Sequence, residues 1–191
     1  MAAVKRIANE VRLQETVLKQ EGVHIAPDES NPLVINLYVV APKEYALPGQ
    51  GPSESPYKGK RFHVKVTLGE NYPHACPEVS ICVARPELNC HYTHFHSNRN
   101  LSRHTSQAVV FAPGTFYHPL VDFATGQLCH LTYSAWWGST CDMLKLGARL
   151  REFMSSPTSE GAVNIEAQSL LTKAADFFAK AKLSCASVPN V

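Results

Sequence analysis

The first twenty residues carry hydrophobic side chains at helical spacing. These positions are Val4, Ile7, Val11 and Leu18. Charged residues occupy many of the positions between them, so one face of the segment is apolar and the others are polar. The pattern predicts an amphipathic helix over about 4–20. We expect Gly22 to end it, because glycine readily adopts the left-handed conformation that follows many helices.

Three later segments have the patterns of β-strands. Residues 33–40 are rich in β-branched side chains, residues 62–68 alternate strictly between apolar and polar, and residues 79–83 form a short apolar run. A loop rich in proline and glycine, 42–56, separates the first two segments. Prolines at 73 and 77 predict a turn before the third, because proline has no backbone donor.

Helical spacing returns towards the C-terminal end. Apolar residues predict one helix over about 143–154, ending before Pro157, and a final helix over about 165–181. The order is then a helix, three strands, an irregular segment and two helices. This order predicts an α+β fold with an antiparallel β-meander.

The irregular segment, 84–115, is rich in His, Asn, Ser and Arg. Five of its side chains are of types that bind metals: Cys90, His91, His94, His96 and His104. Their spacing matches no metal motif known to us, so we favour a solvated loop that holds no metal. Because the segment also contains arginines, the alternative interpretation is that it forms a docking surface.

Composition limits the class of protein. The chain has 191 residues, of which 45% are hydrophobic and 18% charged, which fits one soluble domain with a full core. We assign 1–183 to this domain, with 84–115 as an insertion and 184–191 as a short tail. The net charge of +2 gives no argument for nucleic acid, and no apolar run is long enough to insert into a membrane.

The six cysteines form no C-x-x-C pair and no regular framework. Residues 1–21 alternate charged and apolar positions, unlike a secretory signal. We therefore expect a cytoplasmic protein whose thiols are reduced. We also expect it to need no cofactor.

One segment carries candidate chemistry. It reads Tyr117-His118-Pro119-Leu120 and, after a short loop, Gly126-Gln127-Leu128-Cys129. A His-Pro turn shortly before a cysteine that follows Gly-x-(Leu/Ile) resembles the active-site segment of the ubiquitin-conjugating enzymes. In that family the segment reads His-Pro-Asn and then Gly-x-Ile-Cys-Leu-Asp. The present chain departs from it at Leu120 and at His130-Leu131.

Four further motifs are similar to motifs of that family and stand in the same order. They are the hairpin 55–62, the turn 71–77, Trp137 eight residues after Cys129, and Asn164-Ile165-Glu166-Ala167. The resemblance extends over about 4–171. It implies the ubiquitin-conjugating enzyme fold, with an N-terminal helix, an antiparallel β-meander and C-terminal helices.

One branch of the family resembles the chain more closely at the His-Pro turn. The Akt-interacting (fused-toes) proteins read His-Pro-Leu-Val-Asp and then Gly-x-Leu-Asp, as the present chain reads from His118 to Asp122 and from Gly126 to Leu128. Those proteins are catalytically inactive and bind Hook adaptors. They have Asp where this chain has Cys129.

The resemblance implies a thioester between the Cys129 sulfur and the C-terminus of a modifier. The sulfur then acts first as nucleophile and later as leaving group. In the family, the Asn of His-Pro-Asn stabilises the oxyanion or shapes its loop. Leu120 offers no such donor, and losing one costs about 3 kcal/mol in the barrier. His118, His130 and Glu160 remain candidate helpers, although His118 is better explained as a residue of the turn.

Ligase docking is also expected to differ. The family's apolar anchors fall at His74, Ser139 and Thr140, and buried apolar anchors carry most interface energy. We therefore expect weak binding to ordinary RING-type ligases and an atypical ligase as partner.

Two hypotheses follow from these residues. The first, which we favour, is an atypical conjugating enzyme that carries ubiquitin or a ubiquitin-like protein on Cys129 and receives it from an activating enzyme. The second is an inactive scaffold of the fused-toes type that binds a coiled-coil adaptor. The sulfur at the family position favours the first, and the altered helpers favour the second.

Overall fold

The structure is a computed structural model, and it describes residues 2–82, 116–188 and 190. The expected insertion at 84–115, with its metal-capable side chains and its possible docking surface, lies outside the described residues.

Helix α1, Ala2–Gln20, confirms the predicted N-terminal helix. Its buried side chains include Ala3, Ile7 and Leu18. Gly22 follows with a φ of 74°, the left-handed conformation that was expected after the helix.

Among the described residues, the main sheet has four antiparallel strands in the order β1-β2-β5-β6. They are β1 Val23–Pro27, β2 Val34–Val40, β5 Arg61–Thr67 and β6 Glu78–Cys82. The last three confirm the predicted strands, whereas β1 was not predicted. Five residues with a terminal proline give a weak strand signal, and β1 forms because it pairs with β2.

The loop between β2 and β5 contains a second, small sheet that was also not predicted. Strands β3, Glu44–Tyr45, and β4, Ser53–Glu54, pair there as two-residue strands. Tyr45 is almost fully buried and anchors this loop on the C-terminal helices by stacking on Phe177 at 5.8 Å.

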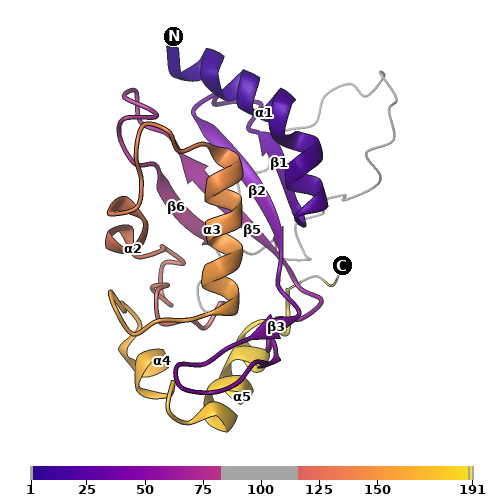
Figure 1. Cartoon of the computed structure of the whole chain (residues 1–191), viewed down its shortest axis with the longest axis vertical. Helices are drawn as coiled ribbons and strands as arrows, with labels where there is room; N and C mark the ends of the chain where they lie inside the picture. The colour runs from indigo at the N-terminus through magenta and orange to yellow at the C-terminus, as the bar shows by residue number, and fades with distance from the viewer. Residues whose placement is uncertain (1, 83–115, 189, 191) are drawn as a thin grey trace.

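Helix α3, Met143–Ser155, crosses the sheet on the same face as α1, and it packs against α1 and β2 (Figure 1). The sheet offers an apolar surface there, because Leu37 pairs with Val64 and Val39 with Phe62, and all four side chains are buried. The Asp142 side chain begins the helix by accepting the Lys145 amide at 2.9 Å.

The opposite face of the sheet carries a buried polar pair. The ring of His63 donates from Nε2 to Asn36 Oδ1 at 2.8 Å, and Tyr38 stacks on the imidazole at 4.9 Å. Burial, with a smaller contribution from the positive charge of Lys65, lowers the pKa of His63 to about 4. The imidazole is therefore neutral at pH 7.

The expected final helix is wrong in one respect, because it is two helices. They are α4, Ile165–Ser169, and α5, Ala174–Ser184, which lie together at one end of the molecule (Figure 1). Apolar spacing continues across the break and so conceals it. A further short helix, α2, His130–Ser134, was not predicted.

The expected C-terminal tail is packed at its described positions. Ser184 belongs to α5, and Cys185 and Val188 are buried in the core. Lys60 donates from Nζ to the carbonyl oxygen of Val188 at 2.8 Å. This part of 184–191 therefore belongs to the folded body.

Candidate functional site

The segment that ends at Cys129 is held by β6. The Ile81 amide donates to the Gly126 carbonyl at 2.8 Å, and the Leu128 amide donates to the Val79 carbonyl at 3.1 Å. Gly126 has a φ of 74°, and a Cβ atom there would lie 2.4 Å from the Ile81 carbonyl oxygen. Only glycine fits this approach without a shift of the backbone.

The His-Pro turn holds the same segment from the other side. The Cys129 amide donates to the Leu120 carbonyl at 2.8 Å, and the Asp122 amide donates to the Gln127 carbonyl at 2.9 Å. Cys129 is thus fixed between β6 and the turn, directly before α2. The residue is 8% exposed.

His118 is fully buried and uses both ring nitrogens inside the protein. Nε2 donates to the Phe153 carbonyl at 2.9 Å, and Nδ1 accepts the Leu120 amide at 3.2 Å. Burial lowers the pKa of His118 to about 4, although the hydrogen bond to Phe153 acts in the opposite direction. The neutral ring therefore ties the turn to α3.

The carbonyl of Pro119 brings the loop before α4 to the site. It accepts the amides of Val163 at 2.9 Å and Asn164 at 3.0 Å. Leu120, the next residue, is fully buried in the core. This position, which aligns with the Asn of His-Pro-Asn in the family that the sequence resembles, is therefore an apolar core position in this chain.

Gly161 lies beside the sulfur. A Cβ atom on Gly161 would lie 3.3 Å from Thr132 Oγ1 and 3.7 Å from Cys129 Sγ. Gly161 has a φ of 74°, so a side chain there would be strained as well as crowded.

The other two candidate helpers lie on the surface. His130 is exposed and its ring packs edge-on against Tyr133 at 5.2 Å. Glu160 is exposed, and its amide donates to Thr158 Oγ1 at 3.1 Å. Among the described residues, no hydrogen bond joins the side chain of either one to Cys129.

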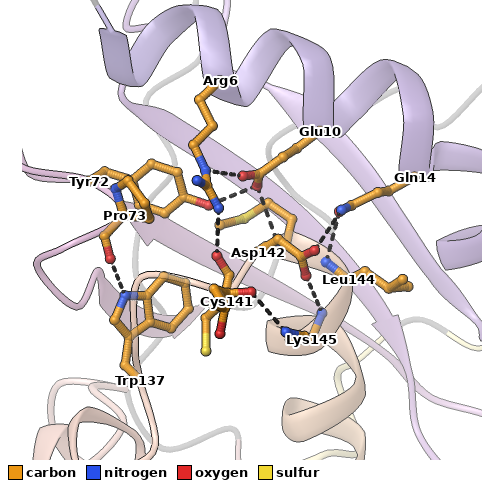
Figure 2. A network of polar contacts seen from close by, with 12 residues as sticks. Arg6, Glu10, Gln14, Tyr72, Pro73, Trp137, Cys141, Asp142, Leu144 and Lys145 are labelled. Atoms are coloured by element: carbon orange, nitrogen blue, oxygen red, sulfur yellow. Dashed lines mark hydrogen bonds and ion pairs between the residues drawn. The ribbon is translucent and has the colours of Figure 1, made fainter.

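A polar network that the sequence analysis missed holds the neighbouring loops (Figure 2). Glu10 is 7% exposed, and its carboxylate accepts three donors. Arg6 Nε donates to Oε1 at 2.7 Å, and the Tyr72 hydroxyl and the Met143 amide donate to Oε2 at 2.7 and 3.2 Å. The network joins α1 to the turn 71–77 and to the start of α3.

The sequence did contain a signal for this network. Glu10 and Gln14 stand on the buried stripe between Ile7 and Leu18, at helical spacing from both. Gln14 extends the network to the helix start, because Nε2 donates to Asp142 Oδ2 at 2.9 Å and Oε1 accepts the Leu144 amide at 3.0 Å (Figure 2). A polar interruption of an apolar stripe indicates a buried polar contact.

The expected ligase-docking positions lie on these loops. His74, Ser139 and Thr140 are all exposed. Trp137 joins the two loops by donating from Nε1 to the Pro73 carbonyl at 2.8 Å (Figure 2). The network therefore fixes the backbone beneath these three side chains.

The described residues contain neither a candidate metal site nor a candidate membrane span. Across 2–82 and 116–188, no group of His, Cys, Asp and Glu side chains gathers in a way that could hold a metal ion. In the same part of the chain, no helix has both the length and the hydrophobicity that crossing a membrane requires.

A small α+β domain with α1 and α3 on one face of an antiparallel sheet, and with a cysteine after a His-Pro turn, belongs to the ubiquitin-conjugating class. The sequence pattern of the family "Ubiquitin-conjugating enzyme" matches residues 6–185. The chain therefore belongs to the ubiquitin-conjugating enzyme family. Among curated proteins, none matches the chain significantly.

Two solved structures are similar over almost the whole chain. One is a crystal structure from Plasmodium yoelii assigned as a ubiquitin conjugating enzyme, with a TM-score of 0.71 and 15% identity, which covers 100% of this chain and 97% of that one. The other is the E2 domain of a Toxoplasma gondii ubiquitin conjugating enzyme, with a TM-score of 0.64 and 14% identity, which covers 96% and 98%. At 15% and 14% sequence identity, these two similarities show a shared fold and nothing further.

Proposed function

We propose that this protein is an atypical conjugating enzyme that carries ubiquitin or a ubiquitin-like protein as a thioester on Cys129. The observation that supports it most is the position of the sulfur. Two backbone ladders hold Cys129 after the His-Pro turn, and the sulfur faces Gly161, which has no side chain to block it.

The reaction has two acyl transfers. In the first, the Cys129 thiolate attacks the thioester of an activating enzyme, and the activating enzyme's thiolate leaves. In the second, an amine or another thiol attacks the new thioester, and the Cys129 thiolate leaves. Each transfer passes through a tetrahedral oxyanion, which requires a hydrogen-bond donor in a partly dry site.

We assign the candidate helpers different roles. His118 is a positioning residue, because both of its ring nitrogens are already bonded and it holds the turn that supports Cys129. His130 and Glu160 are exposed near the site and remain candidates for contact with the incoming nucleophile. An altered docking surface at His74 supports an atypical ligase as partner.

The test of this proposal is a charging assay. The protein is incubated with an activating enzyme, its modifier and ATP, and the products are separated with and without a reducing agent. We expect a thiol-sensitive adduct that is lost in Cys129→Ala and kept in Cys76→Ser, a matched control at another free cysteine. No adduct across a panel of activating enzymes and modifiers would contradict the proposal.

A scaffold of the fused-toes type is the second candidate function. The buried Leu120 supports it, because the core side chain at this position matches that branch and cannot donate to an oxyanion. Its test is titration of a purified Hook-type coiled-coil fragment against the protein. Binding that survives Cys129→Ala, together with no charging, would favour the scaffold.

A further inference from the structure

The hydroxyl of Thr132 is a buried polar group with no hydrogen-bond partner in the described part of the chain. Such a group lowers the stability of the folded protein, so each instance calls for an explanation. Thr132 lies in α2, three residues after Cys129, and its amide donates to the Cys129 carbonyl at 3.2 Å. The unpaired hydroxyl therefore belongs to the helix that begins at the nucleophile.

The Thr132 hydroxyl and the Cys129 sulfur both lie next to Gly161. The Cβ position that glycine leaves empty lies 3.3 Å from Thr132 Oγ1 and 3.7 Å from Cys129 Sγ. The carbonyl oxygen of an acyl group on Cys129 lies two bonds from the sulfur. A hydroxyl on the same side of Gly161 is therefore within reach of that oxygen.

Several other donors around the turn are already used or missing, whereas the Tyr117 hydroxyl and the Asn164 side-chain amide are, like the Thr132 hydroxyl, buried without a partner among the described residues. The Leu120 side chain is apolar, and the Leu120 amide donates to His118. The ring N–H of His118 donates to Phe153. The Cys129 amide donates to the Leu120 carbonyl. Thr132 thus offers a donor beside the sulfur that no described group occupies.

We propose that Thr132 is a catalytic residue that donates a hydrogen bond to the oxyanion of acyl transfer at Cys129. The proposal rests on the proposed thioester function. When the nucleophile bonds to the carbonyl carbon, the π electrons move to the oxygen, and the Thr132 hydroxyl donates to it. The oxyanion then collapses, the carbon–sulfur bond breaks, and Cys129 leaves as a thiolate. Thr132 keeps its proton, and the nucleophile's proton goes to solvent.

A small ester tests the hydroxyl without any activating enzyme. p-Nitrophenyl acetate acetylates a thiol through a tetrahedral oxyanion, whereas iodoacetamide alkylates it without one. Each product is measured on the Cys129 peptide by mass spectrometry. We expect Thr132→Val to slow acetylation about tenfold or more. Thr132→Ser should stay within about threefold, because it keeps the hydroxyl, and alkylation should be equal in all three proteins.

Two outcomes of this experiment would overturn the proposal. One is unchanged acetylation in Thr132→Val. The other is an equal slowing of alkylation, which would place the effect on the thiol and not on the oxyanion. Stability gives a further readout, because replacing an unpaired buried hydroxyl by a methyl group should leave the free energy of unfolding unchanged or higher. A loss of stability would mean that the hydroxyl has a structural partner.

The charging assay separates this proposal from the proposed function. After charging to completion, Thr132→Val should discharge to free lysine or cysteine about tenfold or more slowly than Thr132→Ser. Normal charging with equal discharge would overturn the role of Thr132 and leave the conjugating function intact. If Thr132→Val slows acetylation but no activating enzyme charges the protein, the conjugating function would be overturned and the role of the Thr132 hydroxyl would stand.

Discussion

Single residues that perform no chemistry decide where Cys129 lies. Gly126 allows the chain to approach Ile81, and His118 ties the turn to the end of α3. Both contacts hold the backbone whether or not the sulfur reacts. The His-Pro turn and the Gly-x-Leu pattern therefore predict the position of the cysteine, and its reactivity depends on the groups around it.

Gly126→Ala tests this conclusion at one residue. The new Cβ would lie 2.4 Å from a backbone oxygen at a positive φ, so we expect the free energy of unfolding to fall by about 3 kcal/mol or more. Gly49→Ala is a matched control, because Gly49 has a φ of 73° and nothing within 4 Å of its Cβ position. Gly49→Ala should lower the free energy of unfolding by only about 1 kcal/mol. Equal losses in urea denaturation would contradict the close approach.

Among the elements, one carboxylate joins α1 to the start of α3 and to the turn 71–77. Glu10 accepts from Arg6 on its own helix, from Tyr72 in the turn 71–77 and from Met143 at the start of α3. Burial raises the pKa of Tyr72, and the hydrogen bond to Glu10 raises it further. The phenol is therefore protonated and donates to the carboxylate.

Glu10→Gln should break this junction. An amide has one accepting oxygen, so its NH₂ group would face at least one of the three donors. We expect a loss of about 3 kcal/mol in the free energy of unfolding, because buried donors lose their charged partner. Glu15→Gln, at an exposed position of the same helix, should change it by less than about 0.5 kcal/mol. Equal urea midpoints for the two variants would contradict the assigned role.

Across the described parts of the fold, two imidazoles are buried in separate places. His63 lies on the face of the sheet opposite α3, and His118 lies between the turn and α3. Each has a pKa of about 4, well below the ordinary 6.5, because burial penalises the charged ring. Between about pH 4 and pH 6.5 the unfolded chain therefore binds more protons than the folded chain.

The free energy of unfolding should accordingly fall as the pH drops from 7 to 5. The stabilisation that each neutral ring contributes is fully present above about pH 6.5 and is lost towards pH 4. We expect the free energy of unfolding to fall by roughly 2 kcal/mol per imidazole between pH 7 and pH 5. Urea denaturation at several pH values measures it, and His63→Gln should remove about half of the fall. A midpoint independent of pH in this range would contradict the burial of both rings as neutral groups.

The parts of the fold that sequence predicted are those with strong local periodicity. Helix α1 and strand β5 carry their apolar side chains at regular spacing, and both were predicted close to their observed bounds. Strands β1 and β3 are too short to show a period, and they exist because neighbouring strands complete their hydrogen bonds. The break between α4 and α5 was hidden, because its apolar residues keep a helical spacing.

The candidate site divides in the same way. Motifs and periodicity are local properties of the chain, and they were enough to predict the fold family and the position of Cys129. The folded structure was needed to show that Glu10 and His118 are buried and that Leu120 belongs to the core. It was also needed to show that Gly161 lies next to Thr132 and the Cys129 sulfur. Burial and hydrogen-bond pairing depend on segments that are far apart in the chain and come together only when it folds.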